Sequence, residues 1–309
     1  MKHGTDGPLV LRSDLKTSAI RLPCKVKPMS KRTWKQRGRR LLFIFLIPYL
    51  LVAVLVSLFE SRLVYPNRGA GGFELTSNIS GLSLVSFKTT DGLVLRGMFY
   101  NPENSEGVVL FCHGNGEWIG RHEQWVPSLG DSLKMAVLSY DYRGYGDSEG
   151  SPYEDGLIRD GQAAYQFLID VGFKAENILV FGRSLGGGVA CAIAEKNPIG
   201  GLFLQNTFSS MVDVGASRFF WLPVRLIMRN RFPSDDRIKN YAGPLLQCHG
   251  TNDHVVPIRF GMKLFDSART DDARKTFITV EGGGHNDPLS NETRDKLYKL
   301  AEQIKQSPR

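Results

Sequence analysis

The sequence predicts an α/β domain in which a mostly parallel sheet is covered by helices on both faces. Short segments rich in Val, Leu, Ile and Phe alternate with helical patterns through the second two thirds of the chain. Two segments with alternating polarity, 82–88 and 93–100, flank a turn at Asp91 and Gly92 and predict an antiparallel hairpin ahead of them. The chain has 309 residues, of which 42% are hydrophobic, and this is enough to bury a sizeable core.

The elements of this domain follow one another in a regular order. Strands are expected after the hairpin at 107–112, 135–139, 178–181, 201–205, 244–248 and 275–280, and helices at 154–171, 187–195, 259–268 and 292–306. Parallel neighbours need long connections, which the helical patterns supply. The carboxyl ends of the parallel strands therefore meet at one edge of the sheet, where ligands bind in open α/β folds.

Residues 206–243 interrupt this alternation. They contain aromatic and apolar residues without the period of a strand, so we expect a short helical insertion. The insertion follows the strand at 201–205 and overhangs the edge of the sheet where ligands bind. It is our candidate for a small lid.

An uncharged apolar run from Leu41 to Phe59 precedes the domain. Its 19 residues would form a helix about 28 Å long, close to the thickness of the hydrocarbon layer of a bilayer. A buried core helix would show a polar face, and a cleaved signal peptide would have a shorter basic start and a shorter apolar stretch. We therefore expect an uncleaved transmembrane anchor at 41–59, with a cleaved signal and a soluble helix as the alternatives.

The net charge of +8 is concentrated ahead of this run. Residues 1–40 contain 12 Lys and Arg against 2 Asp and Glu, a net charge of +10, which leaves −2 for residues 41–309. Nucleic-acid binding is disfavoured because it needs positive charge on the folded domain. The positive-inside rule keeps the basic tail 1–40 in the cytoplasm and places the domain 60–309 on the non-cytoplasmic side of the membrane. A reversed anchor would place the domain in the cytoplasm.

The four cysteines do not show the spacing of metal ligands. Cys24 lies in the basic tail, whereas Cys112, Cys191 and Cys248 lie in apolar segments. Buried free thiols pack as small hydrophobic groups, and we expect this role for the last three. The sequence therefore predicts no metal centre built on cysteine.

The candidate nucleophile is Ser184, in the segment Gly182-Arg183-Ser184-Leu185-Gly186 between an expected strand and an expected helix. A serine on a tight strand-to-helix turn has a strained backbone and needs small neighbours on both sides. The turn exposes the hydroxyl at the amino terminus of a helix, whose free amides stabilise negative charge. Taken alone, the five-residue pattern also fits an ordinary glycine-rich turn.

An acid and a base follow Ser184 in the order nucleophile, acid, histidine. Asp253 and His285 each come just beyond the carboxyl end of an expected strand. Neutral His285 can take the proton of the serine hydroxyl, while Asp253 fixes the tautomer of the imidazole and stabilises its charged form. Either residue alone would fit a loop. His249 and His254 compete for the role of base and are disfavoured because they adjoin Asp253 in the sequence.

An oxyanion hole needs two backbone amides directed at one point. Leu185, next to the nucleophile, supplies one of them by its position. We assign the second to Asn115, in the loop 113–116 that follows the strand 107–112. The two glycines of this loop allow the backbone to approach closely, although they also fit a simple turn.

Charged and aromatic residues in the stretch 141–148, DYRGYGDS, directly follow another expected strand. They would shape the pocket or stabilise the fold, and the second interpretation is favoured. In it Asp141 and Arg143 form an ion pair and the glycines make the turn. Glu117 and Asn286 adjoin the catalytic loops and are expected to order them rather than to act in catalysis.

Six segments together resemble a known family: VLFCHGNGE, SYDYRGYGDSEG, VFGRSLGGGVA, LPVRLIMRNRF, CHGTNDHVVP and GGGHND. Over residues 60–305 the chain is similar to the membrane-anchored α/β-hydrolase domain-containing proteins, the group around domain-containing proteins 13 and 17 and their bacterial relatives. The resemblance implies the α/β-hydrolase fold and a serine hydrolase that acts on ester or thioester bonds. It also implies the triad Ser184, Asp253 and His285, with the amides of Asn115 and Leu185 as the oxyanion hole.

We therefore expect a serine hydrolase that cleaves lipid-like or acylated substrates through an acyl-enzyme intermediate. This chemistry needs no metal and no organic cofactor. A serine peptidase would share the triad, but peptidases of this type usually carry a larger cap than residues 206–243 provide. A non-catalytic membrane scaffold would normally have lost a residue of the triad, and none is lost.

Overall fold

The computed structural model describes residues 31–66, 73–76, 78–103 and 105–306. The chain divides into two compact units, Met1–Leu50 and Leu51–Arg309. Most of the predicted basic tail, including Cys24, lies outside the described residues.

Helix α1 (Lys31–Leu58) contains residues 41–58 of the predicted anchor 41–59 and begins ten residues ahead of it. The added residues are rich in Lys and Arg, which favour the helix. Residues Thr33–Leu58 are long and apolar enough to cross a membrane, and only 6% of the most apolar window is buried. A core helix of a soluble domain would be mostly buried, so this helix suggests membrane association.

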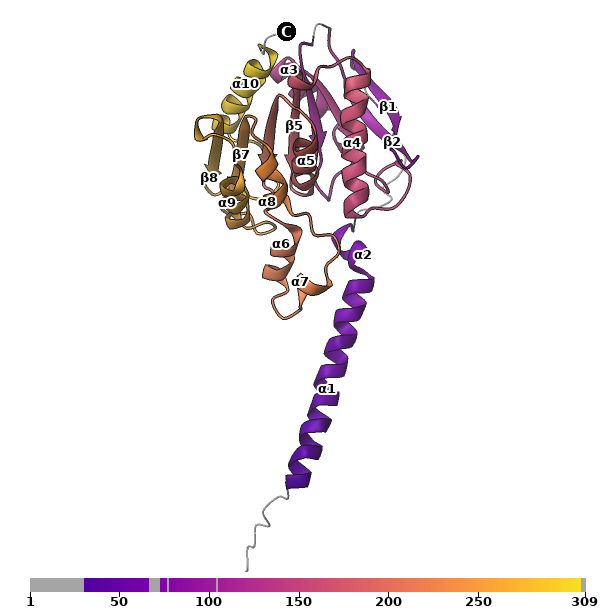
Figure 1. Ribbon diagram of the computed structural model, residues 1–309. Helices are drawn as coiled ribbons and strands as arrows, with labels where there is room; N and C mark the ends of the chain where they lie inside the picture. Colours follow the sequence, from indigo (N-terminus) through magenta and orange to yellow (C-terminus); the bar gives the residue numbers. More distant parts are fainter. Residues whose placement is uncertain (1–30, 67–72, 77, 104, 307–309) are drawn as a thin grey trace, which may run out of the picture. The chain divides into compact units, whose positions relative to one another are not determined.

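The second unit contains one eight-stranded sheet with the strand order β1-β2-β4-β3-β5-β6-β7-β8 (Figure 1). Strand β2 runs antiparallel to β1 and β4, and all other neighbours are parallel. The mostly parallel sheet with its antiparallel start is confirmed. The strands are β1 (Leu82–Lys88), β2 (Val94–Tyr100), β3 (Val108–Cys112), β4 (Ala136–Tyr140), β5 (Ile178–Arg183), β6 (Gly201–Gln205), β7 (Leu245–Gly250) and β8 (Lys275–Val280).

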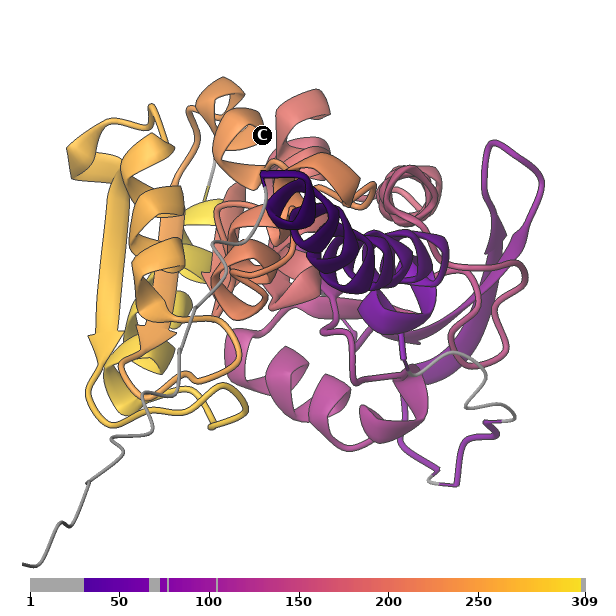
Figure 2. The same ribbon diagram turned by 90° about the horizontal axis from the view of Figure 1, so that it is seen from below.

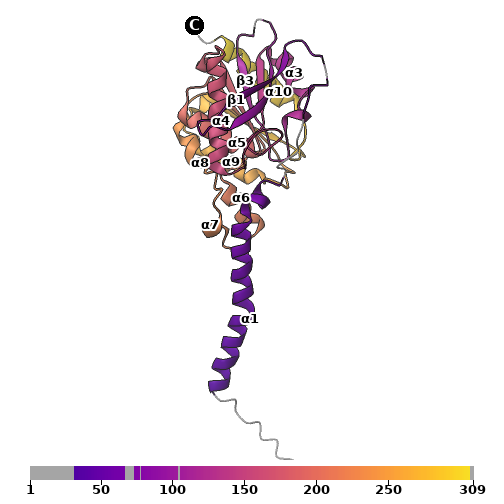
Figure 3. The ribbon, with the colours of Figure 1, turned by 90° about the vertical axis from the view of Figure 1, so that its right-hand side faces the viewer.

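Helices cover both faces of this sheet, as predicted (Figures 1 and 3). One face carries α4 (Glu154–Asp170), α5 (Leu185–Lys196) and α9 (Ile258–Ser267), and the other carries α3 (Trp125–Leu133) and α10 (Asn291–Lys305). The central strands supply alternate residues to the two cores. Because both faces are buried, these strands appear in the sequence as continuous apolar runs.

Helix α3 was not expected from the sequence. Its nine residues include Pro127 and Gly130, and both residue types have low helix propensity. Pro127 lies in the first turn, where its missing N–H costs no helical hydrogen bond. Gly130 is needed for packing, because a Cβ there would lie 2.6 Å from the ring of Tyr100. Tertiary packing therefore overrides local propensity in this helix.

The segment predicted as a helical insertion contains three short α-helices, α6 (Met211–Arg218), α7 (Val224–Ile227) and α8 (Ser234–Arg237), and a 3-10 helix at Ile238–Asn240. It leaves the sheet at the carboxyl end of β6. Helices α6 and α7 lie beyond the sheet and near the short helix α2 (Glu60–Val64) (Figure 1). Figure 2 shows the second unit from this end.

Candidate active site

Ser184 lies between the end of β5 and the first residue of α5. Its backbone adopts φ +52° and ψ −119°, a conformation that residues with a side chain rarely occupy. The Ser184 amide donates to the carbonyl oxygen of Gln205 at 3.0 Å, while its own carbonyl oxygen accepts from Gly187 N at 3.0 Å and from Thr207 Oγ1 at 2.8 Å. Strand β6 and the residues that follow it therefore support the strained turn.

Two glycines allow the backbone around this turn to pack closely. A Cβ at Gly186 would lie 1.9 Å from the carbonyl oxygen of Cys112, and a Cβ at Gly182 would lie 2.6 Å from the Cβ of Ala190. Cys112 is the last residue of β3, and its backbone is held in the sheet by pairing with Gly182 of β5. The small residues expected on both sides of the nucleophile are therefore required by contacts with β3 and α5.

The three side chains predicted as a triad form one hydrogen-bonded chain. His285 Nε2 is 2.9 Å from Ser184 Oγ, and His285 Nδ1 is 2.7 Å from Asp253 Oδ2. The other oxygen of Asp253 accepts from the amides of Val255 at 2.9 Å and Val256 at 2.8 Å. A carboxylate can only accept, so it assigns the proton to Nδ1 and leaves Nε2 to accept from the serine hydroxyl.

The two competing histidines occupy different places. His249 is buried in β7, with Nε2 3.3 Å from Asp253 Oδ2 and within hydrogen-bond distance, 2.8 Å, of the Val256 carbonyl oxygen. His254 is exposed. Neither histidine contacts Ser184 in the part of the chain that the structure describes, so only His285 reaches the nucleophile.

Asp253 lies in an environment that keeps it ionised. Burial by itself would raise the pKa of this carboxyl. Hydrogen bonds from His249, His285 and the Val256 amide outweigh burial and hold the pKa well below its usual range. A permanently charged Asp253 is what the base of a triad needs to keep one tautomer and to stabilise its protonated form.

The loop after β3 is fixed beside the nucleophile through its asparagine. The side-chain amide of Asn115 donates to the carbonyl oxygen of Val64, and Asn115 Oδ1 accepts from the hydroxyl of Tyr145. The backbone amides of Asn115 and Leu185 have no backbone acceptor among the described residues. The oxyanion hole assigned to these two amides stays a prediction.

Glu117 and Arg183 join the loops around the site. Glu117 Oε2 accepts from Gly114 N at 3.1 Å, and Glu117 Oε1 lies 2.9 Å from Arg183 Nη1. Arg183 Nη2 donates to Asn286 Oδ1 at 3.2 Å. Burial would raise the pKa of Glu117, but His122 and Arg183 together lower it to about 2. Glu117 and Asn286 thus order the loops as expected. Their shared partner, Arg183, was not predicted from the sequence to have this role.

The nucleophile and the base open into a cavity of about 710 Å³. Its apolar lining comes from Phe111, Trp125 and Val255, and its polar lining includes Glu117 and Arg183. Among the described residues, no group of three or more His, Cys, Asp or Glu is placed to hold a metal ion.

The expected ion pair between Asp141 and Arg143 is wrong. Arg143 is buried and donates to Asp160 Oδ1 at 2.9 Å and to Asp91 Oδ2 at 2.9 Å. Asp141 instead accepts from the amide of Ile119 at 2.9 Å. The partners come from segments far away in the sequence, so the short spacing between Asp141 and Arg143 was misleading.

Replacing Asp141 with asparagine should make folding stability less sensitive to pH. Burial raises the pKa of Asp141 to about 7, whereas an unfolded carboxyl titrates near pH 4. Between these values the folded state binds more protons, so Asp141 lowers stability as the pH rises. Relative to the wild type, Asp141→Asn should therefore gain on the order of a few kcal/mol between pH 4 and pH 8. Chemical unfolding of both proteins at several pH values measures this, and a constant difference would contradict it.

Asn206, the first residue of the insertion, is a positioning residue that was not predicted from the sequence. It is buried with φ +48°, and its Nδ2 donates to the carbonyl oxygens of Gly284 at 3.2 Å and His285 at 2.7 Å. Its Oδ1 accepts from Gly250 N at 3.1 Å. Asn206 thus ties the loop that carries His285 to the end of β7. Asparagine directly after a strand, a residue that tolerates positive φ, was the available signal.

Asn206→Ala should lower kcat by about 10-fold to 100-fold with little change in KM, because His285 loses the contacts that aim it at Ser184. Steady-state kinetics on a small ester measure the effect. Asn197→Ala, at the end of α5, is the control and should leave both constants unchanged. An effect confined to KM would show that Asn206 does not position the base.

Comparisons with known proteins identify the family of this chain. The family described as serine aminopeptidase, S33, matches residues 103–234. An uncharacterized protein of Mycobacterium tuberculosis is 36% identical over 237 residues, which cover 74% of this chain and 81% of that protein. The human alpha/beta hydrolase domain-containing protein 17B is 30% identical over 202 residues, which cover 65% of this chain and 68% of the human protein.

A solved structure shows the same fold. The esterase Pf2001 of Pyrococcus furiosus matches with a TM-score of 0.61 and 19% sequence identity, over 78% of this chain and 97% of the esterase. At this identity the match concerns the fold, whereas the curated relatives match in sequence over most of their length. The chain therefore belongs to the α/β-hydrolase domain-containing proteins and is a serine hydrolase.

Proposed function

We propose that the protein hydrolyses carboxylic ester or thioester bonds, with Ser184, His285 and Asp253 as its catalytic triad. The observation that carries this proposal is the continuous chain of hydrogen bonds, 2.7 Å from Asp253 to His285 and 2.9 Å from His285 to Ser184. This series of hydrogen bonds ends at Ser184, which lines a cavity large enough for a small organic substrate.

In the proposed reaction Ser184 Oγ attacks the carbonyl carbon of the substrate while His285 Nε2 takes the hydroxyl proton. The amides of Asn115 and Leu185 stabilise the negative charge that forms on the carbonyl oxygen. His285 then gives the proton to the departing alcohol or thiol, which leaves an acyl group on Ser184. A water molecule, activated by His285, releases the acid and restores the enzyme.

The proposed substrates are lipid-like or acylated molecules. Support comes from the apolar side chains of Phe111, Trp125 and Val255 in the cavity and from the apolar helix α1 ahead of the domain. We propose a single-pass protein on the basis of the positive-inside rule. It would have a cytoplasmic tail at 1–40, an anchor at 41–59, and a catalytic domain at 60–309 with a lid at 206–243 on the non-cytoplasmic side.

A serine peptidase is the second candidate, because the matching family is described as serine aminopeptidase, S33. An aminopeptidase needs a carboxylate that can receive the free amino group of a peptide. Glu117 lines the cavity, but its carboxylate lies 2.9 Å from Arg183, which already balances its negative charge. We therefore favour ester or thioester hydrolysis.

Labelling with a fluorophosphonate probe tests the proposal in membranes that contain the full chain. The wild type and Ser132→Ala, which alters an exposed serine of α3, should be labelled equally, and Ser184→Ala should not be labelled. p-Nitrophenyl esters of rising chain length and an aminoacyl p-nitroanilide then define the bond that is cleaved. Labelling of Ser184→Ala would refute the nucleophile, and turnover of the anilide alone would establish a peptidase.

A further inference from the structure

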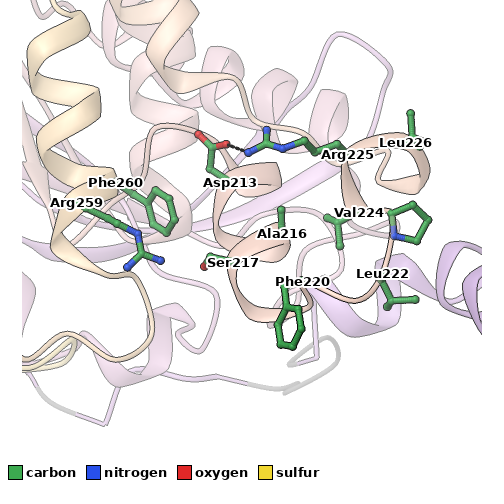
Figure 4. A pocket seen from close by; sticks show the side chains of 11 residues that line it. Asp213, Ala216, Ser217, Phe220, Leu222, Val224, Arg225, Leu226, Arg259 and Phe260 are labelled. Atoms are coloured by element: carbon green, nitrogen blue, oxygen red, sulfur yellow. Dashed lines mark hydrogen bonds and ion pairs between the residues drawn. The ribbon is translucent and has the colours of Figure 1, made fainter.

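An exposed apolar surface on the insertion has no part in the proposed reaction. Phe220 and Leu226 are 85% and 86% exposed, and Phe219 and Trp221 are about half exposed. These four residues, which we call the apolar tip, lie on α7 and on the loop between α6 and α7. Phe220 and Leu226 border a groove of about 540 Å³ (Figure 4). Large exposed apolar side chains gathered on one segment mark an interaction surface.

The apolar tip is fixed beside the last turn of α1. The buried carboxylate of Glu60 accepts from the amides of Arg229 at 3.0 Å and Asn230 at 2.8 Å. Ser57 Oγ donates to the carbonyl oxygen of Ile227 at 3.4 Å. All these residues belong to the second unit, so the contacts lie within one compact body. The depth of the tip is therefore set by the point at which the helix leaves the membrane.

The surroundings of the apolar tip have the composition of a membrane interface. Three further apolar side chains are exposed from the end of α1 through α2: Leu58, Phe59 and Leu63. Residues 218–231 contain four arginines and no acidic residue, and the arginines are exposed. Aromatic and aliphatic side chains flanked by arginine suit the boundary between acyl chains and phosphate groups.

We propose that the apolar tip inserts into the leaflet of the bilayer that α1 leaves, as a second membrane contact of the catalytic domain. The proposal rests on the membrane anchor proposed above. A second copy of the chain fits the tip less well, because the arginines of 218–231 would face one another across a symmetric contact. Arg225 already pairs with Asp213 at 2.9 Å, and lipid phosphates would neutralise the other three arginines, Arg218, Arg229 and Arg231.

This second contact has a consequence for access to the site. The insertion leaves the sheet at Asn206, which is bonded to the carbonyl oxygen of His285 at 2.7 Å. Entry of the apolar tip into the bilayer would therefore hold the catalytic edge of the sheet toward the membrane surface.

Fluorescence quenching in full-length protein, reconstituted in nanodiscs of zwitterionic and anionic phospholipid, tests the proposal. Single cysteines are introduced as Phe220→Cys or Leu226→Cys in a Cys24→Ser background, since Cys112, Cys191 and Cys248 are buried. Each cysteine carries a polarity-sensitive fluorophore. Leu50→Cys reports on the anchor. Val171→Cys is the matched control, because Val171 is an exposed apolar residue at the carboxyl end of α4.

Brominated lipids should quench the labels at 220 and 226 as strongly as the label at 50, and aqueous iodide should quench only the label at 171. Tip labels that iodide quenches, with position 50 protected, would overturn the inference and leave the anchor in place. Protection from both quenchers would indicate a covering protein and also overturn it. Iodide quenching at position 50 would refute the anchor together with the inference, whereas labelling of Ser184 by the fluorophosphonate would still report on the reaction.

Discussion

Replacing Asp253 with asparagine should lower kcat by about 10⁴-fold while the protein stays folded. The asparagine side chain would keep an oxygen for the amides of Val255 and Val256, but it would present an NH2 group to the histidines. Because two donors cannot face each other, His285 should turn to the tautomer with the proton on Nε2. That nitrogen could then no longer accept the proton of Ser184.

The control for this variant is His254→Asn, in the same loop but exposed, which should retain wild-type kcat. Kinetics on a small ester and thermal unfolding of each protein separate catalysis from stability. Reactivity toward fluorophosphonate should fall with kcat, because both reactions need the same proton transfer. A fall in kcat of less than about tenfold would show that Asp253 does not set the tautomer of the base.

Gly186→Ala should destabilise the second unit by more than about 3 kcal/mol. Local propensity predicts the opposite, since alanine in a helix is favoured over glycine by about 1 kcal/mol. The clash decides the sign, because the new Cβ would lie 1.9 Å from the carbonyl oxygen of Cys112. Strand β3 and helix α5 would have to separate beside the nucleophile.

Thermal unfolding in detergent measures this change, and a loss of about 10 °C in Tm is expected. Gly38→Ala, in α1, is the control because a Cβ there has no neighbour within 4 Å. It should leave the Tm of the second unit unchanged. An unchanged or raised Tm for Gly186→Ala would show that β3 and α5 can shift at low cost.

The sequence determined the parts of this protein that depend on local pattern. Continuous apolar segments predicted the central strands at nearly their observed bounds, because strands buried on both faces of a sheet need apolar residues at every position. The apolar run at 41–59 predicted a helix because it is long enough to span a bilayer as one. The order of Ser184, Asp253 and His285, each after a strand, was enough to predict that the side chains would meet, because parallel strands end at one edge.

Only the tertiary structure decided the features that depend on partners distant in sequence. Arg143 pairs with Asp160 and Asp91 rather than with Asp141, and Asn206 holds the loop of His285 through contacts that cross 79 residues of chain. Helix α3 forms despite its proline and glycine. Hydrogen bonds and packing act between neighbours in space, and no local pattern records which distant residue becomes a neighbour once the chain has folded.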